Sequence, residues 1–495
     1  MLSSTHSRIL TNLPWLGLLL LIILSITILL PVLPNDFWWY LRLGQDILTT
    51  NSVPLVDNYS STVFGQSVSY PMWLSAVLLY ALYNLGDLTL VVFSRGLMIS
   101  VFYIFLWLIC VKKGAPGWLA TVLTLVCALA GANNWAVRPQ MFVYPLFGFA
   151  LYLFSTTSGN KEKSGKEFVD EYLKENNQTD EFSNKYYWLI PIALFWANLH
   201  GSVIVLFFLM GPFFLFRQRN KKFVFVLLLA FLATFVNPRG PILWLETVQF
   251  IQSSGIQFSQ EWKPPTNSGW QMNIFFLWFL VFIPLVKFSS NKLKIHEWIW
   301  LMGFGWMAFS GVRHVVWFLA LLLIFSSWLL QGLVKRKFNG IRFEIITFNI
   351  ILLVILSLLP LSLLPGIREY WWKQSPQSIS QNTTITAAAW LNQHPELPGP
   401  IFNDYVYGSY LIFTIPERPV WIDTRFHIYP SQQWEEYLSI SNAEPGWLEK
   451  LKENKIGTLF LDNSSQKNLI QEMKKSSTFC EVYNDEIAVI FSICK

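Results

Sequence analysis

Charged residues are scarce in this sequence, and their scarcity excludes an ordinary soluble protein. Asp, Glu, Lys and Arg make up 13% of the 495 residues, whereas soluble domains usually carry about 25%. Hydrophobic residues reach 53% and aromatic residues 17%. Long apolar runs recur through the first three quarters of the chain, which is typical of helices that cross a bilayer. The composition therefore predicts a polytopic α-helical membrane protein.

The net positive charge is small and cysteines are few. The first observation argues against nucleic-acid binding, and the second argues against a cysteine metal site. The formal net charge is +6, which fits basic cytoplasmic loops better than a nucleic-acid-binding surface. The chain has four cysteines, and their spacing fits no metal site. Cys110 and Cys127 lie in apolar runs, where they are expected to pack. Cys480 and Cys494 lie in the polar tail, where they either pair or stay free.

About eleven apolar segments are candidate transmembrane helices. They cover residues 14–33, 88–111, 116–133, 139–156, 186–199, 201–217, 222–237, 271–287, 296–311, 313–333 and 343–365. No small-residue cleavage site follows the first segment, so we interpret it as a retained helix and not as a signal peptide.

The distribution of lysine and arginine among the loops predicts which ends of these helices face the cytoplasm. If the short apolar segment 71–86 does not cross the membrane, the basic loops share the side of the N-terminus. If it crosses, every later loop changes side and the positive-inside bias is reversed. We therefore expect a re-entrant or interfacial helix at 71–86, inside a long external loop at 34–87. The N-terminus is then cytoplasmic at the cell membrane, and the tail is extracytoplasmic.

Polar residues concentrate at the predicted outer ends of the spans. They occur in NDFWWYLR (35–42), NNWAVRPQ (133–140), NLHG (198–201), NPRG (237–240), QEWKPP (260–265) and GVRH (311–314). Ionisable residues at membrane depth are costly and usually mark a pathway or a site. Arginine, histidine and amide groups on one side suit an anionic ligand, such as a phosphate at the level of the lipid headgroups.

These segments supply the candidate site residues. Asp36 follows the first span and stands beside aromatic residues, where a carboxylate can act as a general base. The candidate binding residues are Trp38, Trp39, Arg42, Arg138, Gln140, Asn198, His200, Asn237, Arg239, Arg313 and His314. Structural alternatives stay open: an aromatic belt for the tryptophans, turns or caps for the asparagines, and snorkelling or buried packing for the cations. Asp57 is either functional or part of an Asx turn, and Glu261 is ambiguous.

The order of these features resembles that of GT-C type glycosyltransferases, which include protein O-mannosyltransferases, the lipid A aminoarabinose transferase and the catalytic subunit of oligosaccharyltransferase. The shared order is a first span, an acid-bearing external loop, an apolar helix after Tyr70-Pro71, and a span ending in basic residues. The chain is most similar to a group of bacterial GT-C-like membrane proteins. That similarity covers nearly the whole chain and rests on Asp36 with Trp38 and Trp39, residues 138–140, 198–201 and 237–240, Asn403-Asp404-Tyr405 with Gly408, and residues 423–425.

The resemblance implies a membrane enzyme that moves a sugar from a polyprenyl-phosphate donor to a lipid, glycan or protein acceptor outside the cytoplasm. Its partners are then the donor, the acceptor and the membrane lipids. Asp36 is the implied base, and Arg138, His200, Arg239 and Arg313 hold the phosphate. The better-known enzymes carry another acid in the second external loop, but NNWAVRPQ has no carboxylate. We therefore expect a site without metal or cofactor.

The tail, 367–495, predicts a small extracytoplasmic α/β domain after a GT-C-like membrane domain at 1–366. Its patterns predict strands at 400–404, 419–423 and 457–462, helices at 405–414, 431–440 and up to about 475, and a hairpin at 480–493. Asp404, Asp423 and Arg425 stand at strand ends, and we favour an internal Asp–Arg pair over a site there. No glycine-rich nucleotide fingerprint is present in the tail.

Two other functions remain as alternatives to a glycosyltransferase. A transporter or flippase of an anionic lipid would be favoured by internal repeats and polar residues near the midplane, and the sequence shows no repeat. A non-catalytic membrane scaffold, with the tail as its binding module, would be favoured if the polar residues never shared a cavity.

Overall fold

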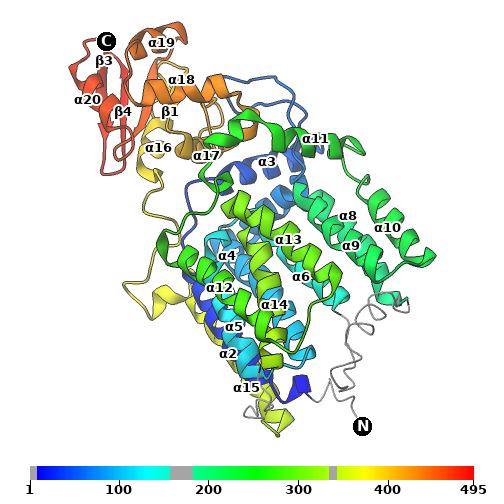
Figure 1. The fold of residues 1–495 in the computed structure, drawn as a ribbon. Helices are drawn as coiled ribbons and strands as arrows, with labels where there is room; N and C mark the ends of the chain where they lie inside the picture. Colours follow the sequence, from blue (N-terminus) through cyan, green and yellow to red (C-terminus); the bar gives the residue numbers. More distant parts are fainter. Residues whose placement is uncertain (1–7, 156–181, 334–342, 495) are drawn as a thin grey trace. The chain divides into compact units, whose positions relative to one another are not determined.

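The computed structural model describes residues 8–155, 182–333 and 343–494 (Figure 1). Most of two charged segments used to predict the topology, 157–185 and 335–342, lies outside these residues. The chain forms two compact units, each assembled from three stretches of sequence. The helical unit takes its residues from Met1–Leu30, Val91–Pro241 and Glu261–Ser375. The mixed unit takes its residues from Pro31–Leu90, Ile242–Gln260 and Pro376–Lys495.

The helical unit is built from apolar α-helices, and each of the eleven predicted spans corresponds to a helix. The helices are α2 (Leu13–Leu29), the second part of α4 (Trp73–Lys112), α5 (Gly117–Ala130), α6 (Gln140–Phe154), α8 (Leu189–Leu199), α9 (Ile204–Phe216), α10 (Lys221–Ala233), α12 (Gly269–Phe288), α13 (Ile295–Ser310), α14 (Val315–Leu333) and α15 (Ile346–Leu358). That all eleven cross a bilayer, and the side on which each end lies, stay predictions.

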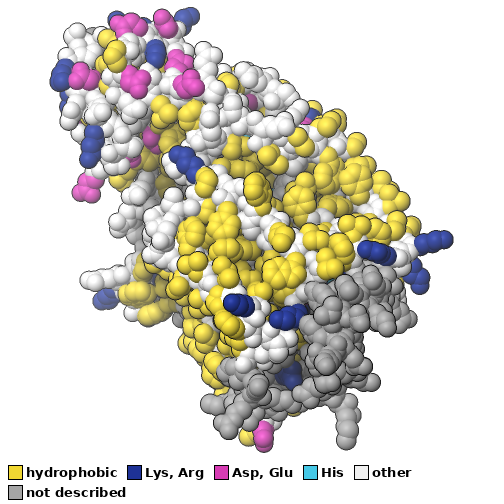
Figure 2. All heavy atoms as spheres, viewed as in Figure 1, with side chains coloured by type: hydrophobic (Ala, Val, Ile, Leu, Met, Phe, Trp, Pro, Cys, Tyr) yellow, Lys and Arg dark blue, Asp and Glu magenta, His cyan; other side chains and the backbone are white. Residues whose placement is uncertain are grey.

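Apolar side chains on the surface identify an integral membrane protein. Within the described ranges, four helices are long and apolar enough to cross a membrane: Trp73–Lys112, Gly269–Phe288, Val312–Leu333 and Ile346–Leu363. Leu277 and Leu280 of α12 and Ile351 and Ile355 of α15 are exposed. Figure 2 shows hydrophobic side chains over much of the visible face of these helices. Surface of this kind is stable when it faces lipid and costly when it faces water.

Helix α4 contains a break at the place where the sequence separates two apolar segments. Its backbone leaves the helical conformation at Gly86 and Asp87, and Asp87 has a φ of 51°. Glycine is a common cause of such kinks because it tolerates conformations that other residues avoid. The segment 71–86 is therefore largely helical and separate from the following predicted span. That it does not cross the membrane stays a prediction.

The mixed unit contains a four-stranded sheet with the strand order β1-β2-β4-β3. Strands β1 (Ile401–Asn403) and β2 (Thr458–Asp462) are parallel, and β4 (Ala488–Ile493) is antiparallel to both β2 and β3 (Phe479–Asn484). The predicted strands at 400–404 and 457–462 and the hairpin at 480–493 are confirmed.

The helices of the mixed unit are α3 (Phe37–Thr50), the first part of α4, α11 (Ile242–Gln252), α16 (Ile385–Asn392), α17 (Tyr405–Thr414), α18 (Ser431–Ser441), α19 (Trp447–Glu453) and α20 (Lys467–Lys475). The boundary between residues 366 and 367 stays a prediction.

The predicted strand at 419–423 is wrong, because this segment does not join the sheet. Val420 instead forms an isolated parallel bridge with Ser60 from the first loop. The side chain of Asn403, at the end of β1, donates to the Ile422 carbonyl and accepts from the Trp421 N–H, both at 2.8 Å. The segment is extended, as its sequence predicts, but its backbone groups bond to a side chain and to a distant loop.

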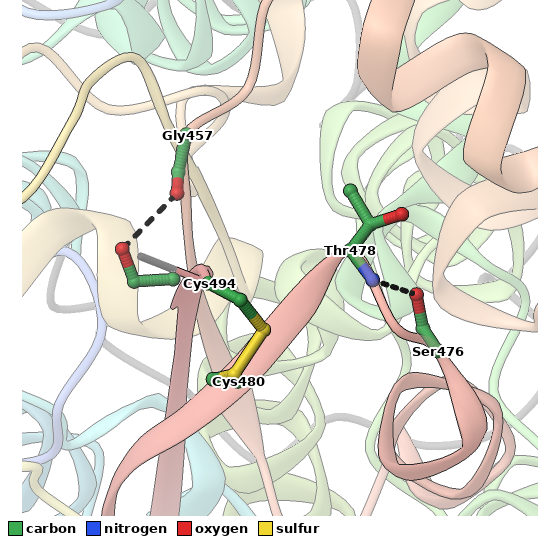
Figure 3. Close-up of a disulfide and its surroundings, with 6 residues drawn as sticks. Gly457, Ser476, Thr478, Cys480 and Cys494 are labelled. Atoms are coloured by element: carbon green, nitrogen blue, oxygen red, sulfur yellow. Dashed lines mark hydrogen bonds between the residues drawn. A yellow bond between two sulfur atoms is a disulfide. The ribbon is translucent and has the colours of Figure 1, made fainter.

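The two cysteines of the tail form a disulfide, which settles the pairing that the sequence left open (Figure 3). Cys480 belongs to β3, and Cys494 follows the end of β4. The bond therefore closes the open end of the hairpin. Cys110 and Cys127 are free and buried, as expected for packing residues.

Candidate functional site: an arginine cluster in the helical unit

Arg138 forms the first part of a charged cluster at the helix ends of the helical unit. It precedes Pro139 and Gln140, where α6 begins, and its Nη1 donates to Oε1 of Glu261. The two side chains are 17% and 41% exposed. Glu261 lies in the short 3-10 helix η5 (Gln260–Trp262). The Oε1 atom of Gln140 is buried and has no hydrogen-bond partner among the described residues.

Trp262, next to Glu261, contacts two further candidates from the 3-10 helix η6 (Val312–His314). The Cζ atom of Arg313 lies 4.4 Å from the centroid of the Trp262 ring, which is cation–π geometry. The His314 ring meets the same indole edge-on, with centroids 5.6 Å apart. The backbone N–H of Val312 donates to the Lys263 carbonyl at 3.1 Å. We name Arg138, His200, Glu261, Trp262, Arg313 and His314 the arginine cluster.

His200 belongs to this cluster as a neutral group. It caps the C-terminal end of α8, and its Nδ1 accepts the backbone N–H of Ser202 at 3.1 Å and lies 2.8 Å from the Ser202 hydroxyl. An accepting Nδ1 leaves the ring proton on Nε2. Burial, and then the charges of Arg313 and His314, lower the pKa of His200 to about 3. His200 is therefore neutral at neutral pH and can act there only as a neutral hydrogen-bonding group.

Glu261 is ionised at neutral pH. Burial alone raises the pKa of its carboxyl, but the charge and hydrogen bond of Arg138 and the charge of Arg313 outweigh burial. The pKa therefore lies below its usual range. With histidine counted as neutral, the cluster holds two positive charges and one negative charge. Its surplus of one positive charge suits an anionic ligand.

The candidate asparagines have structural roles in the same unit. Asn198 is buried, and its Nδ2 donates to the carbonyls of Leu194 and Val236 at 2.9 and 2.8 Å, which joins α8 to the chain after α10. Asn237 forms a turn, because its Oδ1 accepts the backbone N–H of Arg239 at 2.7 Å. The turn alternative is confirmed for Asn237. Binding roles for Asn198, Asn237 and Arg239 stay predictions.

The other predicted residues belong to the mixed unit. Asp36 is the N-cap of α3 and has helical backbone angles, and its side chain does not cap the helix. Arg42 forms an ion pair at 3.0 Å with Asp46, one turn further along α3. Asp46 also accepts the Tyr59 hydroxyl at 2.8 Å. Arg42 therefore already has a carboxylate partner within its own unit.

Trp38 and Trp39 are buried inside the mixed unit, with 3% and 2% of their surface exposed. The Trp38 indole N–H donates to the Leu33 carbonyl at 3.1 Å, and its ring meets Tyr410 edge-on at 4.8 Å. The Trp39 ring lies 6.2 Å from that of Tyr70. Their burial excludes the aromatic-belt alternative. Contact with a sugar or prenyl chain stays a prediction that these packing contacts do not support.

A fully buried ion network occupies the mixed unit. Arg425 donates to both oxygens of Asp423, from Nε at 2.9 Å and from Nη2 at 2.6 Å. Its Nη1 donates to Asp57 and, at 3.0 Å, to the Tyr70 hydroxyl. The Tyr429 hydroxyl donates to Asp423 at 2.6 Å. The favoured interpretation, an internal Asp–Arg pair, is therefore confirmed, and the network extends it to the first loop.

Two further acids of this unit have structural tasks. Asp57 also accepts the backbone N–H groups of Tyr59 and Ser60, at 3.3 and 2.9 Å, so the Asx-turn alternative is confirmed. Asp404 is the N-cap of α17 and accepts the Val406 N–H at 2.9 Å. Burial raises the pKa of Asp404 to about 6, although that backbone hydrogen bond opposes the shift.

Neither Glu261 nor Trp262 is among the site residues predicted from the sequence. The motif QEWKPP was one of the polar outer segments, but nothing in the sequence shows that its acid meets Arg138, 123 residues earlier. The available signal was an acid beside a tryptophan in a predicted external loop, on the side where the arginines accumulate.

The fold defined by these elements is similar to that of solved oligosaccharyltransferase structures. No family model and no curated protein matches the chain. The archaeal oligosaccharyltransferase AglB from Archaeoglobus fulgidus, in complex with an inhibitory peptide and a dolichol-phosphate, is similar over 94% of this chain and 72% of its own, at 10% identity and a TM-score of 0.55. The same organism's oligosaccharyltransferase, tethered to an acceptor peptide with the NVT sequon, is similar over 97% of this chain and 74% of its own. The identity is 11% and the TM-score is 0.55.

A third solved structure, ArnT from Cupriavidus metallidurans bound to undecaprenyl phosphate, covers 96% of each chain at 13% identity and a TM-score of 0.46. The two oligosaccharyltransferase structures confirm the predicted resemblance of the fold to GT-C type glycosyltransferases. Likeness at this level of identity concerns the fold, and the activity has to be argued from the site.

Proposed function

We propose that this protein is a membrane glycosyltransferase that moves a sugar from a polyprenyl-phosphate donor to an extracytoplasmic acceptor. The observation that carries the proposal is the arginine cluster, in which Arg138 and Arg313 contact the adjacent residues Glu261 and Trp262 at the ends of apolar helices. Guanidinium groups match phosphate in charge and hydrogen-bond geometry. The fold supports the same ligand class, because a protein of similar fold has been solved with a dolichol-phosphate.

The proposed reaction gives each residue a distinct task. Arg138 and Arg313 bind the donor phosphate, and neutral His200 adds a hydrogen bond from Nε2. Asp36 takes the proton of the acceptor group as that group attacks C1 of the sugar. The bond between C1 and the phosphate oxygen breaks, and the polyprenyl phosphate leaves as a monoester. The arginines stabilise the charge that develops on this leaving group. The mechanism we propose uses no metal.

Binding of a short-chain polyprenyl phosphate to the full-length protein in detergent tests the phosphate site. Arg138→Gln and Arg313→Gln each remove a charged hydrogen-bonding group, which typically contributes about 1.5–3 kcal/mol. We therefore expect each change to raise the Kd by roughly 10- to 150-fold. Arg219→Gln is the matched control, because Arg219 is an exposed arginine of the helical unit that bonds to the Leu215 carbonyl. Wild-type affinity in both cluster variants would reject the proposal.

Transfer assays with polyprenyl-phosphate-linked sugars test the role of Asp36. Asp36→Asn removes the base but keeps the size of the side chain, so transfer is expected to be lost while phosphate binding stays at the wild-type level. An unchanged transfer rate in this variant would exclude Asp36 as the base. Phosphate binding without transfer by the wild-type protein, across a panel of donors, would instead favour a lipid transporter.

A further inference from the structure

The arginine cluster carries a negative charge that phosphate binding alone does not require. Glu261 bonds directly to Arg138, and the charge of Arg313 also acts on it. A carboxylate beside a bound phosphate repels it and neutralises part of the attraction that the arginines provide. An acid at this position therefore needs a reason other than affinity for phosphate.

The charges of the two lipids in the proposed reaction provide such a reason. The donor is a phosphodiester with one negative charge. Transfer breaks the bond between C1 and oxygen, so that oxygen remains on phosphorus and the product is a monoester. A phosphate monoester carries about 1.5 to 2 negative charges at pH 7. The cluster, with a surplus of one positive charge, matches the donor in charge and not the product.

We propose that Glu261 is a specificity-determining residue that makes the cluster favour a singly charged phosphodiester over a doubly charged phosphate monoester. The inference rests on the proposed function, because it takes the cluster to be the donor phosphate site. Glu261 repels the monoester more strongly than the diester, so the product is released and does not block the site. The same repulsion disfavours lipids that carry a pyrophosphate.

The surroundings of Glu261 fix its carboxylate within the cluster. On one side it bonds to Arg138. On the other side the adjoining residue, Trp262, stacks against Arg313 at 4.4 Å, and the next carbonyl, that of Lys263, accepts the Val312 N–H at 3.1 Å. The contacts of Trp262 and Lys263 hold the backbone beside Glu261, and moving the carboxylate away from a bound monoester would break its own bond to Arg138. The repulsion therefore persists when the charge of the ligand increases.

The test compares two probes that share one chain and differ in charge: a short-chain polyprenyl phosphate and its methyl diester. Both are bound to the full-length protein in detergent at pH 7.5. Glu261→Gln is expected to tighten binding of the monoester about tenfold and of the diester about threefold, so their affinity ratio changes about threefold. Glu261→Ala is a second neutral variant with the same expectation, and Glu261→Asp keeps the charge and the wild-type ratio.

The matched control is Glu369→Gln. Glu369 is an exposed acid of the helical unit that also lies beside an arginine, Arg368, at 3.4 Å, and its removal is expected to leave both affinities unchanged. An unchanged ratio in both neutral variants overturns the inference but leaves the proposed function intact, provided that Arg138→Gln still weakens both probes. Weaker binding of both probes in the neutral variants also overturns it, because Glu261 would then serve to orient Arg138. If Arg138→Gln and Arg313→Gln affect neither probe, the proposed function itself fails.

Discussion

Replacing Arg425 by methionine is expected to destabilise the mixed unit severely. The guanidinium is fully buried, as are the carboxylates of Asp57 and Asp423 that it neutralises. Methionine fills similar space but leaves two buried carboxylates without a cation. Removing one partner from a buried ion pair costs about 3–5 kcal/mol, because the remaining charge has neither water nor a counter-charge. The loss is large beside the total stability of a domain, about 5–15 kcal/mol.

The apparent melting temperature of the full-length protein in detergent measures this loss. For a unit of about 200 residues, 1 kcal/mol corresponds to a shift of about 2–4 °C. We therefore expect Arg425→Met to lower the melting temperature by roughly 6–20 °C. Lys474→Met is the matched control, since it breaks an exposed pair with Glu481, at 3.2 Å, in the same unit. Exposed pairs contribute about 0–1 kcal/mol, so this shift is expected to stay below about 4 °C.

A third variant separates unpaired charge from lost packing. Adding Asp57→Asn and Asp423→Asn to Arg425→Met removes the uncompensated carboxylates, and the melting temperature is expected to recover in part. If Arg425→Met melts within about 3 °C of the wild type, the network does not stabilise the unit and the reasoning is refuted. If the triple variant is no more stable than Arg425→Met, the loss comes from packing and not from charge.

Three further changes test other features. Cys480→Ser opens the disulfide to Cys494 and is expected to cost about 2–4 kcal/mol; a reducing agent should lower the melting temperature of the wild type equally and leave the variant unaffected. Asp404 has a pKa of about 6 in the folded protein, above the value of about 3.9 for an unfolded chain, so the folded state binds this proton more tightly. Its contribution to stability is complete below about pH 4 and is lost as the pH rises through 6, in total about 3 kcal/mol. The melting temperature of the wild type, compared with that of Asp404→Asn, should fall across this range, and an unchanged difference would contradict the shift. Asn198→Ala removes two buried hydrogen bonds and is expected to cost about 1–3 kcal/mol, measured as a lower melting temperature; no change would show that these bonds are not needed.

Much of the fold follows from patterns within single segments. Apolar runs predict the helices of the helical unit, and alternation predicts the hairpin that ends in the disulfide. The segment 419–423 also has a strand pattern, but its partners are Asn403 and the loop at residues 59–61. A pattern predicts an extended backbone, and only the folded chain determines what that backbone bonds to. The same limit applies to the tryptophans of the first loop, which look alike in a membrane belt and in a packed core.

The candidate site also combines residues that the sequence predicts with features that it does not. Arg138, His200, Arg313 and His314 come together, as their shared position at predicted outer helix ends indicates. Glu261 could not be assigned to Arg138, because ion pairs between distant segments leave no local signal in the sequence. The protonation state of His200 was equally hidden, since it depends on burial and on charges contributed by other helices.

The contact between Asp57 and Arg425 spans 368 residues and therefore links events that are far apart during synthesis. At about 5–20 residues per second, a ribosome adds Arg425 roughly 20–70 s after Asp57. Throughout that interval the first loop lacks both its counter-charge and the packing partners of Val63, which belongs to the tail's core. Until then, the bonds of Asp57 to the Tyr59 and Ser60 N–H groups can form within the loop, but its ion pair with Arg425 cannot. A premature stop shortly before residue 425 would thus leave a segment near the N-terminus unable to fold, although every residue of that segment is present.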